Sequence, residues 1–367
     1  MGMLTVADGH IVVMRLFDVA FAIDLGRAEE LWKQRGAGRA ARARLTGTPA
    51  KAVTFGNAPL TVSLESVSIA VEDAPAPAPV SAVARLYDFG AVSIALRVPV
   101  ADLPWDDYVR LMNAIGRAVV PWGELLAQVD AVAGSAMVRR ASREIEEDYL
   151  VGTVRSFNEM LDAAEVMRRI DLVPLLSGET RMLSEGARAE LLRHRFSYYT
   201  DDLVVLTWDR AFVLEPRGDT DVADVLEVAN AQLLEMRYYD ELLDAELPRI
   251  YDLVETARRG LNVFASRRYG TLARRLYTLV AEVTELTERV DNALQVTEDV
   301  YLARIYAAAL DLYRVPLVTA AVNRKIAIVR DTYQALYNEA SSARSELMEI
   351  AVILLIMSEV ALALFRH

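Results

Sequence analysis

Residues 80–98 read Val-Ser-Ala-Val-Ala-Arg-Leu-Tyr-Asp-Phe-Gly-Ala-Val-Ser-Ile-Ala-Leu-Arg-Val, and this stretch decides the fold class of the first part of the chain. It is rich in β-branched and aromatic residues, and it alternates in part with the period of two that a half-buried strand requires. Residues 11–25 and 60–71 have the same character. The first hundred residues are therefore predicted to form mainly strands.

One short pattern occurs next to two of these runs. Residues 15–18 read Arg-Leu-Phe-Asp, and residues 85–90 read Arg-Leu-Tyr-Asp-Phe-Gly. The similarity indicates either a repeated strand unit or a recurring way to begin a strand. Between the two patterns, residues 35–44 are rich in Gly, Ala and Arg and are predicted to be a loop. Residues 72–79 form an Ala-Pro linker that cannot join the interior of a sheet.

From Trp105 onward the apolar residues recur at helical spacing, and Pro121 is expected to kink or split this helix. Further helices are predicted over residues 154–170 and 185–194. Residues 203–208 and 211–214 are predicted as short strands joined by a turn at Asp209-Arg210, with Trp208 in the core. These elements complete a mixed α/β domain over residues 1–216.

Residues 217–346 are predicted to be a long helical section. Its clearest pattern is a 4-3-4-3-4 spacing of apolar residues, typical of a coiled coil or an antiparallel helix pair, at Leu272, Leu276, Leu279, Val283, Leu286 and Val290. The pattern covers fewer than three heptads, so a hairpin within the chain and a coil between copies both stay open. A further helix is predicted after Pro316, and it continues into the C-terminal apolar helix of residues 347–367. The fold class is therefore predicted to be α+β.

Residues 350–365 contain eleven strongly apolar side chains, and this segment is predicted to be a membrane anchor. At roughly −0.3 to −0.6 kcal/mol each they contribute about −3 to −7 kcal/mol to insertion, against about 3 kcal/mol for a central Glu359. A helix over residues 347–365 is about 28 Å long, close to the roughly 30 Å of a bilayer core. The alternative is a buried helix of an assembly. The residues that carry this prediction are Glu349, Ile353, Leu355, Ile356 and Glu359.

The composition excludes several classes of site. The formal net charge of −12 makes long-range attraction to nucleic acid or anionic lipid unfavourable. Cysteine is absent, the three histidines are far apart in the sequence, and no Gly-x-x-x-x-Gly-Lys phosphate loop occurs. No cofactor and no metal are therefore predicted. The N-terminus lacks the pattern of a secretory signal, so the body of the protein is expected in the cytoplasm.

Two charged clusters allow other functions. Paired carboxylates at residues 144–148 and at Asp201-Asp202 with Asp209 are read as solvated faces and turn caps, but they also fit a magnesium-dependent hydrolase of phosphate esters or nucleic acid. A basic patch interleaved with Tyr269 and Tyr277 is read as a solvated helix face, with RNA contact as the alternative. Its arginines are Arg267, Arg268, Arg274 and Arg275.

Several features of the C-terminal third occur together. Asp291-Asn292 is followed by Asp299 and Tyr301, a helix carries the sequence Val-Asn-Arg-Lys-Ile at residues 322–326, and Leu347-Met348-Glu349 leads into the apolar helix that contains Glu359. Upstream, Tyr-Asp-Phe-Gly-Ala-Val at residues 87–92 looks like the strand that opens the same kind of domain. Over residues 195–365 the sequence resembles the family named for being required for meiotic nuclear division. The resemblance implies a membrane-anchored protein and no catalytic residues. The eukaryotic members of that family lie in the mitochondrial inner membrane and are tied to support of mitochondrial translation.

Together these patterns favour a membrane-tethered, oligomerising scaffold or binding protein without catalytic activity. Its expected partners are the membrane, other copies of the chain and a protein of unknown identity. The enzyme alternative is the metal-dependent hydrolase. A relative of CorA-type magnesium channels is a minor alternative, because such channels also place a mixed α/β domain before long helices. The Gly-Met-Asn signature and a second spanning helix expected for that class are absent from the sequence.

Overall fold

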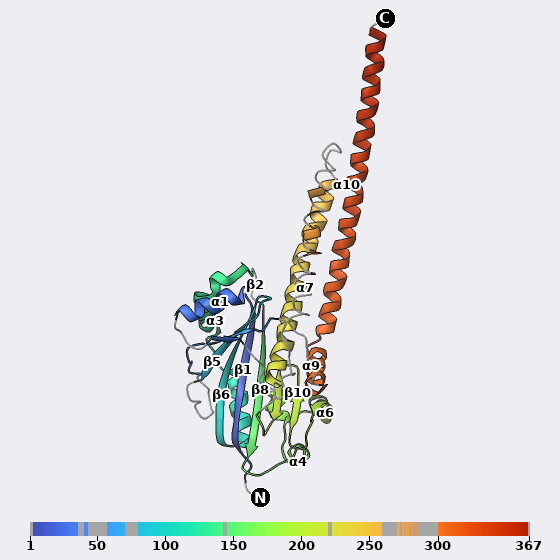
Figure 1. Cartoon of the computed structure of the whole chain (residues 1–367). Coiled ribbons are helices and arrows are strands. Elements are labelled where there is room, and N and C mark those ends of the chain that lie inside the picture. The colour runs from blue at the N-terminus through green and yellow to red at the C-terminus, as the bar shows by residue number, and fades with distance from the viewer. Residues whose placement is uncertain are drawn as a thin grey trace. The chain divides into compact units, whose positions relative to one another are not determined.

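The computed structural model describes residues 3–35, 40–42, 57–69, 80–141, 145–218, 222–258, 270–271, 274, 276–278, 280–281, 284 and 300–365. The chain divides into two compact units (Figure 1). Unit 1 comprises Met1–Glu235 and Arg289–Pro316, and unit 2 comprises Met236–Glu288 and Leu317–His367. The first unit is built on a mixed sheet and the second on helices, which confirms the predicted α+β class.

Unit 1 contains a nine-stranded sheet in the order β3-β4-β5-β6-β1-β8-β11-β10-β9. These strands are β1 (Thr5–Asp18), β3 (Ala40–Arg42), β4 (Leu60–Ser63), β5 (Ser81–Leu86), β6 (Ala91–Pro104), β8 (Glu146–Phe157), β9 (His194–Phe196), β10 (Leu203–Leu206) and β11 (Arg210–Leu214). A separate pair is formed by β2 (Ala20–Ile23) and β7 (Met137–Arg140).

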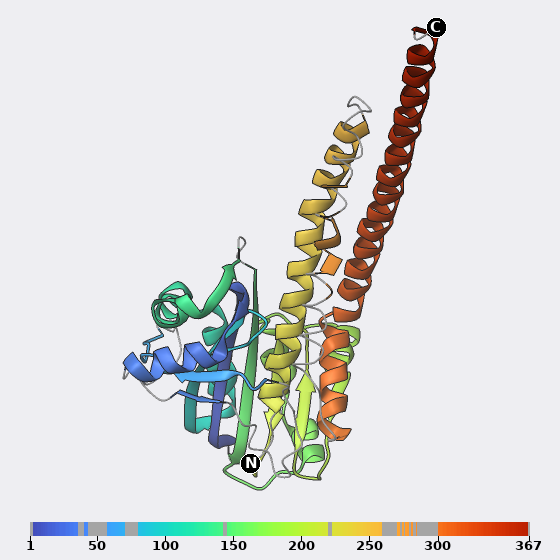
Figure 2. The ribbon, with the colours of Figure 1, turned by 45° about the horizontal axis from the view of Figure 1, so that its top comes forward.

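The long strand β1 is the centre of this sheet. It pairs antiparallel with β6 on one side and with β8 on the other, so the blue strand lies between a turquoise and a green one in Figure 2. Strand β11 pairs parallel with β8. A parallel neighbour needs a long crossover connection, and residues 158–209 supply it.

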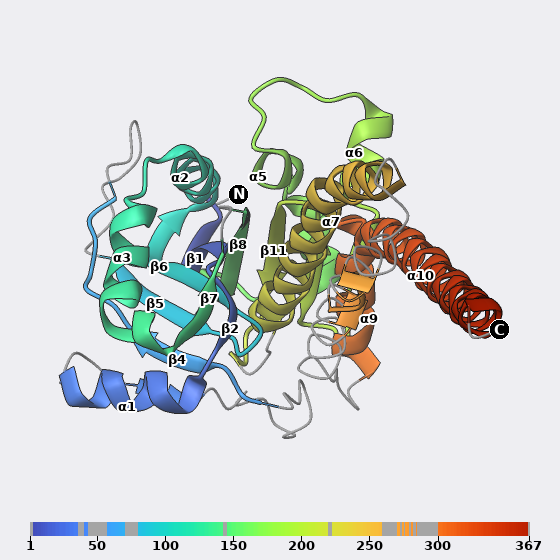
Figure 3. The ribbon, with the colours of Figure 1, turned by 90° about the horizontal axis from the view of Figure 1, so that it is seen from above.

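Helices cover the two faces of the sheet differently. In unit 1 they are α1 (Leu25–Arg35), α2 (Trp105–Arg117), α3 (Trp122–Ala133), the 3-10 turn η1 (Gly134–Ala136), α4 (Ala163–Arg169), α5 (Val173–Ser177), α6 (Glu185–Leu191), the first part of α7 (Val222–Arg258) and α9 (Val300–Leu312). Figure 3 shows α2 and α3 on one side of the sheet and α7 on the other. We call these sides the α2 face and the α7 face.

The α2 face carries the main core. The ring of Trp105 stacks on Tyr108 at 5.6 Å between centroids and meets Phe212 edge-on at 5.8 Å. The Tyr108 hydroxyl donates to the carbonyl of Thr153 at 3.3 Å, which satisfies its one donor in a buried place. Gly152 makes this approach possible, because a Cβ at that position would lie 2.9 Å from the Tyr108 hydroxyl.

Three local predictions are wrong, each for a physical reason. Residues 154–170 are not one helix: β8 runs to Phe157 in the middle of the sheet, and α4 begins only after Asp162, whose side chain forms a capping box with Glu165. The predicted loop at 35–44 contains the edge strand β3. Trp208 is not in the core, since it lies in the turn before β11 and is 67% exposed.

The prediction for Pro121 is confirmed. This proline splits the predicted helix into α2 and α3.

Unit 2 joins the second part of α7, residues 236–258, to α10 (Val315–Phe365). Lys325 on α10 lies 2.7 Å from carboxylate oxygens of both Asp240 and Asp244 on α7. In the predicted apolar seam, Leu276 is buried. The other seam residues, Leu272, Leu279, Val283, Leu286 and Val290, lie outside the described residues.

We expect Asp18 to destabilise unit 1 at alkaline pH. It lies at the end of β1, is 6% exposed, and its Oδ2 has no hydrogen-bond partner among the described residues. Burial raises the pKa of this carboxyl from 3.8 to about 7. The folded chain therefore binds the proton more tightly than the unfolded chain, so this contribution to stability is present below pH 4 and is lost as pH rises to 7.

The substitution Asp18→Asn should stabilise the protein by about 2–4 kcal/mol at pH 8 and change little at pH 4, where the carboxyl is neutral in the folded chain and only partly ionised in the unfolded chain. Denaturant titration at the two pH values measures this. The exposed Asp106→Asn is the matched control and should shift stability by about 0.5 kcal/mol or less. Equal effects of Asp18→Asn at both pH values would contradict the assignment.

Candidate functional site

A pocket of about 440 Å³ lies on the α7 face of the sheet. Pockets of this volume accommodate small molecules. Its walls come from β1, β5, β6, β8 and the start of α7, all within unit 1. Its polar lining side chains are His10, Arg85, Ser93, Arg97, Arg155, Asp224 and Glu227, and apolar lining is supplied by Val12, Met14, Val83, Ala95 and Ala223.

The strand register brings two of these side chains into contact. Val12 on β1 is directly opposite Arg97 on β6, which makes His10 and Arg97 diagonal neighbours on one face. Arg97 Nη2 lies 2.7 Å from His10 Nε2. A guanidinium can only donate, so Nε2 is the acceptor and a neutral His10 carries its proton on Nδ1.

A second arginine lies close to this pair. Burial, followed by the charges of Arg97 and Arg155, lowers the pKa of His10 to about 3, so the ring is neutral at physiological pH. Burial and then the charge of Arg155 lower the pKa of Arg97. Arg155 is 43% exposed, and its Nη1 lies 3.8 Å from a carboxylate oxygen of Asp8. The pocket therefore holds two neighbouring guanidinium groups around a neutral histidine.

The opposite wall of the pocket is a buried ion-pair cluster. Arg85 Nη1 lies 2.6 Å from Asp224 and 2.7 Å from Glu227, and the Tyr87 hydroxyl donates to Glu227 at 2.8 Å. Burial by itself lowers the pKa of Arg85, but the charges of Glu227 and Asp224 raise it further than burial lowers it. Arg85 is therefore charged, and the carboxylates of Asp224 and Glu227 balance its charge. The cluster links α7 to β5.

We expect this cluster to be essential for the attachment of α7. Arg85→Ala should cost about 3–5 kcal/mol, because it leaves the buried carboxylate of Glu227 without its cation. Glu227→Ala should cost less, because Arg85 keeps its ion pair with Asp224. The double variant should be more stable than the sum of the two losses predicts, by about 0.5–3 kcal/mol. Denaturant titration of the four proteins gives the coupling energy, and strictly additive losses would refute it.

The surface pair Arg15 and Glu146 is a matched control for this cycle. The two side chains are 28% and 52% exposed at a distance of 3.1 Å. Exposed pairs of this kind are screened by water, so Glu146→Ala should cost less than about 1 kcal/mol.

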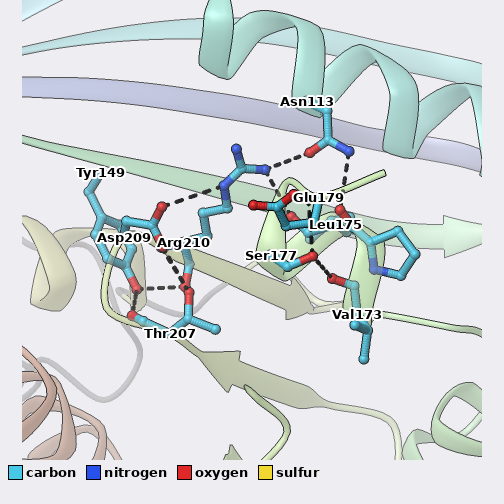
Figure 4. Close-up of polar contacts among 10 residues, drawn as sticks. Asn113, Tyr149, Val173, Leu175, Ser177, Glu179, Thr207, Asp209 and Arg210 are labelled. Carbon is cyan, nitrogen blue, oxygen red and sulfur yellow. Dashed lines mark hydrogen bonds and ion pairs between the residues drawn. The ribbon is translucent and has the colours of Figure 1, made fainter. Parts of the chain in front are cut away.

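A second polar network, on the α2 face, surrounds Arg210 (Figure 4). Arg210 Nη1 donates to Asn113 Oδ1 at 2.6 Å and to the carbonyl of Leu175 at 3.0 Å. The Thr207 hydroxyl accepts from the Arg210 amide at 3.1 Å, which closes the turn before β11. Gly178 lies against the guanidinium of Arg210. A Cβ at this position would be only 2.5 Å from Arg210 Nη2. This network joins α2, α5 and β11 and has a structural role.

The C-terminal part of α10 exposes a continuous apolar surface. The large apolar side chains at residues 350 and 352–357 are each 54–65% exposed. Among the predicted site residues, Ile353, Leu355 and Ile356 belong to this run, and Glu349 and Glu359 are exposed at its two sides. We call residues 350–357 the apolar run. In Figure 1, α10 continues beyond the last described turn of α7, its neighbour in unit 2.

Within the described ranges, no single helix is long and apolar enough to cross a bilayer. One bent pair, Val300–Leu312 with Val315–Asn338, has the required length and composition.

Only some of the remaining predicted site residues lie within the described part of the chain. Arg274 is exposed, whereas Arg267, Arg268 and Arg275 lie outside the described residues. Asp202 accepts hydrogen bonds from the amides of Tyr198 and Tyr199 at 2.7 and 3.1 Å, as a turn cap does. In the part of the chain that the structure describes, no group of three or more acidic or histidine side chains is placed to hold a metal ion.

Sequence reasoning missed His10, Arg97 and Arg155. Each one interrupts an otherwise apolar or small-residue strand, and that interruption was the available signal. What the sequence did not give is the register between strands, which decides that these three residues meet.

The fold and the site together define an α+β protein with an arginine-lined pocket on one face of its sheet. The family described as "Uncharacterized protein MJ0711, N-terminal domain" matches residues 8–220, and the chain belongs to this family. Uncharacterized protein MJ0711 of Methanocaldococcus jannaschii is 24% identical over 217 residues, which are 58% of this chain and 66% of that protein. The match thus covers just under two thirds of the relative. No solved structure matches the chain.

The expected resemblance to the family required for meiotic nuclear division is wrong. The matching family is a different one, and its match covers residues 8–220 rather than the C-terminal third. The features that suggested the resemblance have general causes. Lys325 forms the ion pairs with Asp240 and Asp244, and an apolar helix next to glutamates occurs in many unrelated proteins.

Proposed function

We propose that the protein is a non-catalytic binding protein that is tethered to a membrane by the C-terminal end of α10, with its body in the cytoplasm. The observation that carries this proposal is the apolar run. Its seven large side chains at residues 350 and 352–357 are exposed together on one helix.

The distribution of these side chains around the helix supports lipid as the cover. Successive residues of an α-helix are rotated by about 100°, so six consecutive apolar residues point in all directions. A helix that packs on one partner needs only one apolar stripe, whereas a helix that is apolar all round is surrounded by apolar material on every side. The sequence remains apolar from Val360 to Phe365, which extends the segment towards bilayer length.

The two glutamates support self-association within the membrane. Glu349 and Glu359 bracket the run, and a carboxylate near the middle of a bilayer costs about 3 kcal/mol unless it is protonated or paired. Neighbouring copies of α10 would shield such a group from lipid. A tether that oligomerises accounts for both the apolar side chains and the acidic ones.

Flotation of the full-length chain with neutral phosphatidylcholine vesicles tests the tether. The wild-type chain should float with the vesicles. The double variant Ile353→Asp/Ile356→Asp should remain in the soluble fraction, because two central aspartates oppose insertion by about 5–7 kcal/mol. The matched control, Ser341→Asp/Ser342→Asp, adds the same charge on exposed positions of α10 outside the run and should float like the wild type.

A different result would assign the run to assembly in water. If the wild-type chain ignores vesicles and forms one discrete oligomer without detergent, as measured by analytical ultracentrifugation, then copies of the chain cover the run. A wild-type chain that is monomeric and soluble without detergent would refute both roles.

A further inference from the structure

The pocket on the α7 face has positive charge that its own walls do not balance. Arg85 is compensated by Asp224 and Glu227 at 2.6 and 2.7 Å. Arg97 has no carboxylate within ion-pair distance among the described residues, and its close polar contact is the neutral His10. Arg155 has only the longer contact to Asp8, at 3.8 Å between two half-exposed side chains.

The pair of neighbouring arginines, Arg97 and Arg155, contrasts with the rest of the chain, whose formal net charge is −12. Two adjacent guanidinium groups repel each other, and that repulsion costs stability unless an anion lies between them. They are held near each other by the backbone, since Arg97 is on β6, Arg155 is on β8, and β1 pairs with both strands. The geometry is therefore imposed by the sheet and is present before any ligand arrives.

The rest of the pocket limits the size and character of such an anion. The volume of about 440 Å³ is large enough for an anionic group with a small organic body. Val12, Val83 and Ala95 give apolar wall beside the arginines. His10 adds a neutral ring whose Nδ1 carries the proton, so it offers a donor and no competing charge.

We propose that the pocket formed by His10, Arg97 and Arg155 binds the phosphate group of a phosphomonoester. A phosphomonoester carries a charge of about −1.5 to −2 at pH 7 and has three acceptor oxygens. This charge suits Arg97, which has no ion pair among the described residues, and Arg155, whose ion pair with Asp8 is long, at 3.8 Å. The planar fork of each guanidinium donates two parallel hydrogen bonds to such a group. A carboxylate has only one negative charge and two oxygens, so it would engage the two guanidinium groups less completely. The phosphate belongs either to a soluble ester or to the headgroup of a lipid.

Isothermal titration calorimetry of the full-length chain with inorganic phosphate, in a neutral detergent, tests the site. The wild-type chain should bind phosphate saturably. Arg97→Gln and Arg155→Gln should each weaken binding about tenfold or more, because each removes a charge-assisted contact. Arg193→Gln is the matched control and should leave binding unchanged. Arg193 lies just after α6, is 68% exposed, and forms an ion pair with Glu190 at 3.4 Å.

The source of the phosphate is distinguished by a second measurement. Glycerol 3-phosphate is titrated as a soluble ester, and vesicles with phosphatidic acid are compared with neutral vesicles as a lipid source. Tighter binding of either probe than of inorganic phosphate supports the site, provided that Arg97→Gln and Arg155→Gln weaken it. Arg97→Lys keeps the charge without the fork and should bind with intermediate affinity.

Two results would overturn the proposal. One is the absence of saturable binding of every phosphate probe up to a Kd of about 10 mM. The other is equal binding by the wild-type chain and a folded Arg97→Gln/Arg155→Gln double variant, with folding verified by thermal unfolding. Neither result depends on the membrane tether, since the titration is done in detergent, and loss of flotation with neutral vesicles would leave phosphate binding intact.

Discussion

The structure of unit 1 depends on the double pairing of β1. This strand of 14 residues is hydrogen-bonded along its length to β6 and along most of it to β8. Because side chains alternate along a strand, this register sends Ile11 to the α2 face and His10 to the α7 face. A slip of one residue would exchange the two sets and place charged groups in the core. The register therefore determines both which side chains enter the core and which side chains line the pocket.

The two faces of the sheet serve different purposes. The α2 face is closed by aromatic packing around Trp105, and Arg210 on this face is held by Asn113 and by the backbone carbonyl of Leu175. The α7 face is closed only in part, by an ion-pair cluster at the start of α7. Arg155 beside this cluster remains 43% exposed. A stable layer on one side thus allows a charged pocket on the other, within a domain that the family match covers from residue 8 to residue 220.

The sequence predicted what depends on local pattern. Period-two alternation identified the strands near residues 11–25 and 80–98, and Pro121 correctly separated two helices. Prediction from the sequence failed where contacts between distant residues determine the structure. The side chains of residues 154–157 are compatible with either a helix or a strand. These residues form a strand because they belong to β8, which pairs with β1 and β11. The pocket was missed for the same reason, since His10, Arg97 and Arg155 are separated by more than fifty residues and meet only through strand pairing.

The same reasoning bears on the apolar run of α10, where the local pattern is strong and the large apolar side chains are exposed among the described residues. A water-exposed run of this kind costs free energy at about 25 cal/mol per Å² of apolar area, and the proposed cover would remove that cost. A single partner helix would cover the apolar side chains on one side of α10 and leave those on the other sides exposed to water. In the proposed tether, lipid would cover all sides but leave Glu359 without water, and other copies of α10 would shield that group. Membrane insertion and self-association together would therefore satisfy both the apolar side chains and the glutamate of this segment.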